Sequence, residues 1–181
     1  TDENGHGAHM AGIVLNSEQG TSTPKFNGVA PDADLIMVKA FDANGAGSYS
    51  DVIRGMQWIL DHQAFYGIRV VNLSLSAPVA SYYWDDPLNQ TVMAAWQAGL
   101  VVVASAGNTG PDPMSVGVPG NLPYVITVGA MTDNYTPGDG TDDFLASWSA
   151  TGPSVEAFLK PEVLAPGGHM VSKMPESSSI A

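Results

Sequence analysis

Short, continuous runs of apolar residues recur along the chain and are separated by more polar stretches. Four such runs are expected to form strands, because parallel strands that are covered on both faces are apolar throughout. The predicted strands are residues 34–41, 70–75, 100–106 and 124–130.

Helical periodicity fills the intervals between the first three runs. The stretches 50–66 and 87–98 place apolar residues three or four positions apart, and a glycine follows each stretch. Ser50 is the expected N-cap of the first helix. Residues 6–16 predict a further helix. Alternating strands and helices indicate an α/β protein with an open, mainly parallel sheet between helices.

The pattern changes after the third apolar run. Residues 107–123 join two predicted strands without a helix, and a loop of this length in a compact domain is more often functional than idle. Ligands of open α/β sheets bind beyond the carboxyl ends of the strands. We therefore expect the active edge to contain Ser74–Ala77, Gly107, Asn108 and Gly117.

Composition narrows the functional classes. The 181 residues include 18 acidic and 6 basic side chains, for a formal net charge of -12, and 44% of them are hydrophobic. This charge argues against nucleic acid and anionic membrane surfaces as partners. No apolar run approaches the roughly 18 residues of a membrane span. There is no cysteine, which excludes disulfides and a thiol nucleophile.

Seven motifs occur in the order and approximate spacing of one protein family. They are "GHGAHMAG", "GVAPDADLIMVKAF", "NLSLS", "VVVASAGN", "VGVPG", "VITVGA" and "KPEVLAPGG". Together they resemble the subtilisin-like serine proteases over nearly the whole chain. The resemblance implies a three-layer subtilisin-like fold and hydrolysis of protein or peptide substrates through an acyl-enzyme. It also implies a secreted or cell-surface location.

The first motif carries a histidine among very small residues. By the resemblance, His6 is the catalytic general base that takes a proton from a serine hydroxyl. Gly5, Gly7 and Ala8 leave room for a peptide to approach. His9 follows at the spacing of a metal pair, but no glutamate lies between the two histidines, so the zinc-protease pattern is absent. We interpret His9 as a structural residue of the helix.

The resemblance also assigns an oxyanion site and a substrate-binding surface. Asn108 aligns with the asparagine that donates to the developing oxyanion. The neighbouring glycines and small residues allow close backbone approach of a peptide. The residues implied in substrate binding are Gly45, Ala46, Gly47, Ser74, Leu75, Ser76, Ala77, Ser105, Ala106, Gly107 and Gly117.

Two members of the family's catalytic triad are not found in the chain. Asp2 lies too close to His6 to be the triad aspartate, which precedes the histidine by tens of residues in this family. Ser177, Ser178 and Ser179 lack the context of the nucleophilic serine. We therefore expect residues 1–181 to be the central part of one peptidase domain, inactive alone, lacking the N-terminal aspartate strand and the C-terminal serine helix. Exposed sheet edges would then promote self-association.

Two alternatives stay open. The first is a non-catalytic relative that keeps the fold as a peptide-binding or structural module. The second concerns the acidic segment 133–144, in which Asp139, Asp142 and Asp143 could hold a structural calcium ion. A solvated acidic loop is the simpler interpretation of that segment. No other cofactor is expected, and no residue is assigned to a metal.

Overall fold

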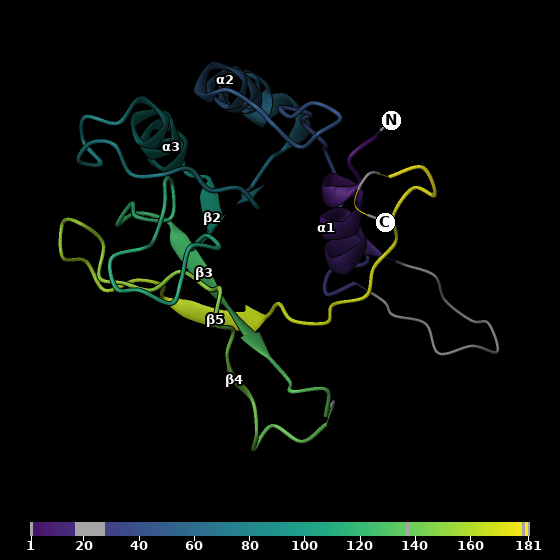
Figure 1. Ribbon diagram of the computed structural model, residues 1–181. Helices are drawn as coiled ribbons and strands as arrows, with labels where there is room; N and C mark the ends of the chain where they lie inside the picture. The colour runs from purple at the N-terminus through teal and green to yellow at the C-terminus, as the bar shows by residue number, and fades with distance from the viewer. Residues whose placement is uncertain (1, 17–27, 137, 179, 181) are drawn as a thin grey trace. The chain divides into compact units, whose positions relative to one another are not determined.

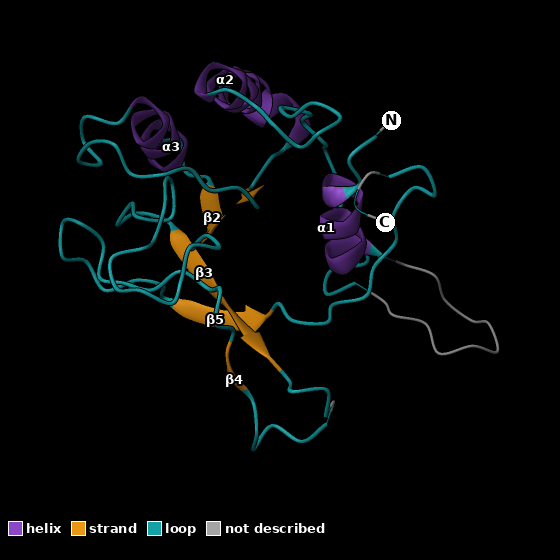
Figure 2. Ribbon diagram, viewed as in Figure 1, coloured by secondary structure: helices purple, strands orange, loops and turns teal. Residues whose placement is uncertain are grey.

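The computed structural model describes residues 2–16, 28–136, 138–178 and 180. The chain divides into two compact units, which we treat separately. Unit 1 comprises Thr1–Gly55 and Met170–Ala181, and unit 2 comprises Met56–His169. Figure 1 shows the elements along the chain and Figure 2 their secondary structure.

Five strands of unit 2 form one sheet (Figure 2). β1, β2 and β3 are parallel neighbours in that order, β5 pairs parallel with β3, and the short β4 pairs antiparallel with β3. Val128 of β3 pairs with Ser105 on one edge and with Val163 on the other. The bounds are β1 Val70–Leu73, β2 Val101–Ser105, β3 Ile126–Thr132, β4 Phe144–Leu145 and β5 Val163–Pro166. The predicted mainly parallel α/β architecture is confirmed.

The core of unit 2 lies on one face of this sheet. Burial alternates along β1 and β2, so that Val71 and Val102 are buried while Val70 and Val101 stay exposed. Helix α3, Pro87–Gln97, packs against β2 and buries Leu88, Val92 and Ala95. Each fully buried side chain of this size contributes roughly 1.5–3 kcal/mol to folding. Outside this core, Val70, Val101 and Ile126 are exposed.

The three predicted helices are present, and one predicted cap is wrong. Helix α2, Tyr49–Tyr66, spans the boundary between the two units. Ser48 caps it in place of Ser50, because the backbone N–H of Asp51 donates to the Ser48 hydroxyl at 3.2 Å. The carboxylate of Asp51 in turn accepts from the backbone N–H of Ser48 at 3.1 Å, which completes a capping box. Gly67 follows the helix in the left-handed conformation, with φ of 66°.

One strand prediction fails because the predicted segment has no pairing partner among the described strands. Residues 34–41 form no strand, and Leu35, Ile36 and Met37 in this segment are exposed. An apolar run becomes a strand only when a neighbour accepts its backbone hydrogen bonds, and none of the described strands pairs with it. Conversely, β4 and β5 were not predicted from the sequence.

The outer edge of β1 is the part of the sheet at which two copies of the chain could pair. β1 ends the series of parallel strands, so its outer edge has no partner strand among the described residues. Self-association through such an edge stays a prediction. Within the described part of the chain, no helix has the length and apolar character needed to cross a membrane.

The cap of α3 gives a test of this fold. Asp86 is buried, and its carboxylate accepts from the backbone N–H groups of Leu88 and Asn89 at 2.9 Å each. Asp86→Ala in the full-length protein should lower the free energy of unfolding by about 1–2 kcal/mol, because two helix donors lose their acceptor. Urea unfolding measures the change. Asp85→Ala at the exposed neighbour is the control, and an equal loss in both variants would contradict the cap.

Candidate active site

His6 is the first residue of α1, His6–Leu15, in unit 1. Its side chain is exposed, and the preceding Gly5 has φ of 94°, a conformation that favours glycine. The carboxylate of Asp2 accepts from the backbone N–H of Gly5 at 3.0 Å and of Ala8 at 2.7 Å. These bonds lower the pKa of Asp2 and hold the start of the helix. Asp2 thus anchors α1, which agrees with its exclusion as the triad aspartate.

His9 has structural partners in unit 1. Its Nε2 lies 3.3 Å from the carbonyl oxygen of Met170, and the Ser172 hydroxyl donates to the His9 carbonyl at 2.7 Å. Across the described ranges of the chain, no three histidine, aspartate or glutamate side chains gather in a way that could hold a metal ion. The contacts of His9 fit the structural role expected for it.

Gly45–Gly47 form an exposed turn of unit 1. The carboxylate of Asp42 accepts from the backbone N–H groups of Asn44 and Ala46 at 2.9 Å each, and this lowers its pKa. Gly45 has φ of 76°, which the turn requires. Ala46 and Gly47 line an open hollow of about 620 Å³. The segment therefore has open space beside it, and its role in substrate binding stays a prediction.

The structure brings the other predicted binding segments together in unit 2. Ala77 and Val118 exchange two backbone hydrogen bonds of 2.9 Å. The N–H of Gly117 donates to the Ala106 carbonyl at 3.0 Å, and the Ser105 hydroxyl donates to the Leu75 carbonyl at 2.9 Å. The four segments that meet at the carboxyl ends of β1 and β2 are 74–77, 105–107, 108–110 and 117–118.

Two glycines permit this close approach. Gly107 has φ of 106°, and a Cβ there would lie 2.8 Å from the Ser76 hydroxyl oxygen. A Cβ on Gly117 would overlap that same hydroxyl and lie 2.6 Å from the carbonyl oxygen of Ala77. Any larger residue would push the segments apart.

Asn108 follows directly on this junction and is exposed. Its side-chain amide has no hydrogen-bond partner in the described part of the chain, so its donors remain available. The backbone on either side is held, because the N–H of Ala150 donates to the Gly107 carbonyl at 2.9 Å and the N–H of Gly110 donates to the Trp148 carbonyl at 3.0 Å. A fixed backbone with a free amide suits an oxyanion donor.

The sequence reasoning missed a buried lysine behind this loop. The side chain of Lys160 is only 1% exposed. Its ammonium donates to the Val125 carbonyl at 3.2 Å and the Thr127 hydroxyl at 3.0 Å, and lies 2.6 Å from a Glu162 carboxylate oxygen. Burial lowers the pKa of Lys160, an effect that Glu162 opposes. A lysine within the motif "KPEVLAPGG" was the available signal.

The acidic loop between β3 and β4 uses its carboxylates locally. Asp139 accepts from the Thr141 hydroxyl at 2.6 Å, and Asp142 accepts from the Thr136 hydroxyl at 2.7 Å. These bonds lower the pKa of both carboxyl groups. The geometry gathers no metal-binding group of acidic side chains from the described residues, including Asp143. Calcium in this loop stays a prediction.

Of the three consecutive serines near the end of the chain, Ser177 and Ser178 lie within the described residues. The Ser178 hydroxyl is buried without a hydrogen-bond partner in the described structure, and it lies 2.5 Å from where a Cβ of Gly5 would stand. Ser177 is exposed, and Ser179 lies outside the described residues.

The close approach at Gly117 yields a stability prediction. Gly117→Ala should lower the free energy of unfolding of the full-length protein by about 1–3 kcal/mol, because the new methyl group overlaps Ser76 and Ala77. Gly140→Ala is the matched control, since its Cβ would meet only the Asp143 carboxylate at 3.6 Å. Urea unfolding of both variants measures the difference, and equal stability would show that the segments separate without cost.

The sequence of the chain is similar to those of known proteins. The model of the Subtilase family matches residues 1–181. Serine protease AprX of Bacillus subtilis (strain 168) is 40% identical over 184 residues, which cover 99% of this chain and 41% of AprX. Subtilisin DY of Bacillus licheniformis is 34% identical over 180 residues, which cover 98% of this chain and 57% of that protein.

A solved structure gives the same answer for the fold. Sphericase superposes with a TM-score of 0.78 at 29% identity, over 96% of this chain and 56% of that one. The chain thus spans less than two thirds of the length of each of these relatives. Its fold is the subtilisin-like α/β fold, and the chain belongs to the subtilase family.

Proposed function

We propose that the full-length protein is a serine endopeptidase that hydrolyses peptide bonds of proteins through an acyl-enzyme. The observation that carries the proposal is the junction at the carboxyl ends of β1 and β2, where glycines allow close backbone approach and Asn108 presents a free amide. Family membership supports the same reaction class. It also supports a secreted or cell-surface location, which we include in the proposal.

His6 and Asn108 have separate roles in this reaction. His6 takes the proton from the attacking serine hydroxyl and later returns a proton to the leaving amine. The exposed start of α1, held by Asp2, leaves its imidazole accessible. Asn108 donates to the oxygen of the scissile carbonyl as negative charge develops on it, which lowers the barrier without tightening ground-state binding.

The peptide substrate would be held mainly by its backbone. In unit 1, the segment 44–47 would offer its backbone to the peptide. In unit 2, the segment 74–77 would do the same, and Ser105–Gly107 with Gly117 would line the pocket for one side chain. The bridge between Ala77 and Val118 supports this, because it fixes the wall of that pocket. The Ser76 side chain leaves no room for a Cβ at Gly117 there, which would narrow the pocket.

The nucleophilic serine and the triad aspartate would come from the full-length protein outside these residues. Asp2 is occupied by two backbone donors, and the Ser178 hydroxyl makes no hydrogen bond in the described structure. Relatives of greater length accommodate this arrangement, since the chain covers 41% of AprX.

Substitution of the proposed base tests the assignment of His6. His6→Ala in the full-length protein should abolish most peptide hydrolysis, because the serine hydroxyl then has no proton acceptor. Hydrolysis of a fluorogenic peptide measures the loss. His62→Ala is the control, since His62 stacks on Trp58 at 4.2 Å within α2. If His6→Ala hydrolysed the peptide within a few-fold of the rate of the parent protein, His6 would not be the general base.

Asn108 should act on the transition state. Asn108→Leu should lower kcat by about 100-fold to 1,000-fold with little change in KM, the range established for an oxyanion asparagine of subtilisin, a related protein. Steady-state kinetics separate the two constants, and Thr109→Ala on the same loop is the control. A raised KM with unchanged kcat would show that Asn108 binds substrate instead.

Active-site labelling separates the enzyme from a non-catalytic module. A fluorophosphonate, which labels activated serines, should label the full-length protein and not the isolated 181-residue chain. Labelling of the short chain at Ser177, Ser178 or Ser179 would place the nucleophile within it. Absence of labelling in both, with peptide binding retained, would favour the peptide-binding module.

A further inference from the structure

We propose that unit 2 carries a second substrate subsite, a cavity that binds a basic side chain, arginine or lysine, of the polypeptide. The cavity has a volume of about 270 Å³, which accommodates a side chain of this size. It lies between the β3–β4 loop, the segment after β4 and the turn after β5. The proposal rests on the peptidase function proposed above.

Four of the nine residues that line the cavity carry aromatic rings. Tyr135 stacks on His169 with ring centroids 3.5 Å apart, and Phe144 and Trp148 complete the wall with partly exposed rings. The faces of aromatic rings attract cations, and the planar guanidinium of arginine stacks on them. Open rings of this kind suit a long side chain with an apolar stem and a charged head.

Carboxylates lie just behind this wall. The carboxylate of Asp133 is 3.3 Å from Nδ1 of His169, and that of Asp142 accepts from the side-chain amide of Asn134 at 3.1 Å. The Thr136 hydroxyl and the Asn134 amide lower the pKa of Asp142, so its carboxylate is an anion at neutral pH. Asn134 itself lines the cavity, which connects the carboxylate to the cavity surface.

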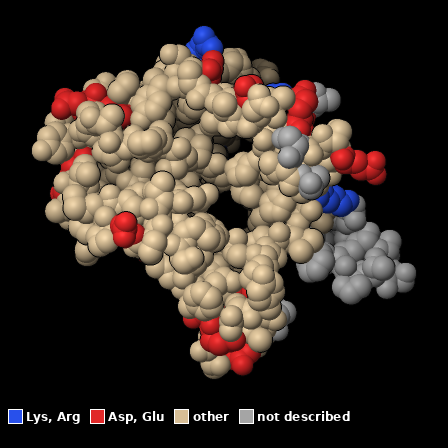
Figure 3. Space-filling view, in the orientation of Figure 1, with Lys and Arg blue, Asp and Glu red and all other residues tan. Residues whose placement is uncertain are grey.

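No basic residue compensates this charge nearby in the sequence. The chain contains neither lysine nor arginine between Arg69 and Lys160. Figure 3 shows acidic side chains gathered over the loop between β3 and β4. The uncompensated negative charge favours a cationic occupant over a neutral or acidic one.

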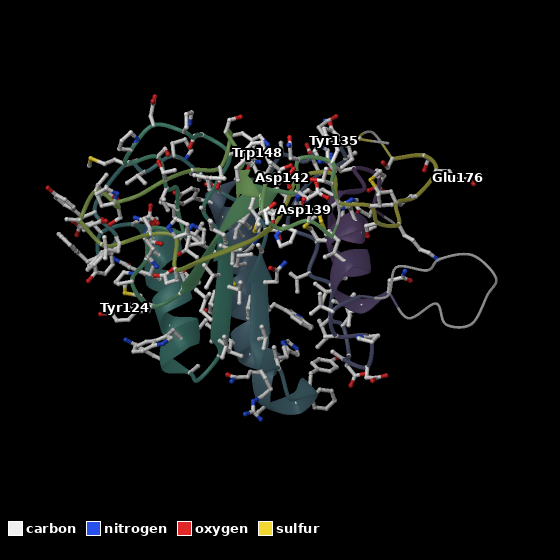
Figure 4. All side chains as sticks on the ribbon, turned by 90° about the horizontal axis from the view of Figure 1, so that it is seen from below. Tyr124, Tyr135, Asp139, Asp142, Trp148 and Glu176 are labelled. Carbon is white, nitrogen blue, oxygen red and sulfur yellow. The ribbon has the colours of Figure 1, made fainter. Side chains whose placement is uncertain are left out.

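The cavity wall is hydrogen-bonded to the loop that carries the proposed oxyanion donor. The backbone carbonyl of Trp148, a residue of the cavity wall, accepts from the backbone N–H of Gly110 at 3.0 Å, two residues beyond Asn108. In Figure 4, Tyr135, Asp139, Asp142 and Trp148 lie together toward one end of the sheet, while Tyr124 lies toward the other. The hydrogen bond between Gly110 and Trp148 ties the loop that carries Asn108 to the backbone of one wall residue of the cavity.

The backbone around the cavity is strained. Asn134, Tyr135 and His169 have φ of 48°, 62° and 58°, in the left-handed region that residues other than glycine rarely adopt. Such conformations persist where the surrounding structure enforces them, and they concentrate at binding and catalytic sites. Here they turn Tyr135 and His169 into the wall of the same cavity.

The test compares arginine with citrulline, its neutral near-isostere, in peptides cleaved by the full-length protein. Each quenched fluorescent peptide carries one of the two residues at a single position on either side of the cleaved bond. At one position or more, kcat/KM should be about threefold to thirtyfold higher for arginine. The double variant Asp133→Asn, Asp142→Asn should bring this ratio close to one. Asp85→Asn, outside the cavity, should leave it unchanged.

A second pair of variants tests the aromatic wall. Tyr135→Ala should lower kcat/KM for the arginine peptide at that position, whereas Tyr82→Ala, an exposed aromatic residue outside the cavity, should not. Equal cleavage of arginine and citrulline peptides at every position would overturn the proposal and leave the peptidase function intact. The proposal would also be overturned if phenylalanine were preferred over arginine at that position and the aspartate variants left this preference unchanged.

A binding measurement separates this proposal from the peptidase function. N-acetyl-arginine amide is titrated into the full-length protein and followed by the indole NMR signal of Trp148, which Trp148→Phe identifies by its loss. N-acetyl-citrulline amide is the control ligand. Selective perturbation by the arginine compound in a protein that cleaves no peptide would uphold the cavity and refute the peptidase. No perturbation of Trp148 in an active enzyme would refute the cavity.

Discussion

The candidate site in unit 2 depends on one steric constraint, the close approach of two backbone segments at Gly107 and Gly117. A Cβ at either position would enter the space of Ser76, so hydrogen atoms alone fit there. The constraint holds 74–77 against 117–118 and lets the loop turn into Asn108 at the end of β2. A glycine loses more backbone conformational entropy on folding than other residues do. The surrounding hydrogen bonds offset this cost.

A buried charge holds the same loop from its other side. The Lys160 ammonium donates to the Val125 carbonyl and the Thr127 hydroxyl and forms an ion pair with the Glu162 carboxylate. The Thr127 hydroxyl in turn donates to the Gly120 carbonyl at 2.6 Å. Desolvation of the ammonium is costly, so the three oxygen partners are needed to keep it in place. Residues 117–127 are therefore fixed at both ends, and a rigid support of this kind positions a functional side chain more accurately than a free loop.

Local patterns predicted the helices, while long-range strand pairing could not be predicted from them. Periodicity is a property of neighbours in sequence, which is why α1, α2 and α3 were found within about a residue of their ends. Residues 34–41 have the same apolar character as β2 and still form no strand, because a strand also needs a partner. Lys160 and Trp148 escaped for a related reason, since burial and cavity walls arise only when distant segments meet.

The negative charge of the β3–β4 loop bears on both the proposed oxyanion site and the proposed cavity for a basic side chain. Negative potential would oppose the oxyanion of the proposed reaction, and the β3–β4 loop supplies four aspartates in a stretch with no basic residue between Arg69 and Lys160. A cationic side chain in the cavity would offset part of that potential at the moment of reaction. The substrate would then contribute charge that the protein lacks, so that recognition of a basic residue would raise kcat as well as lower KM.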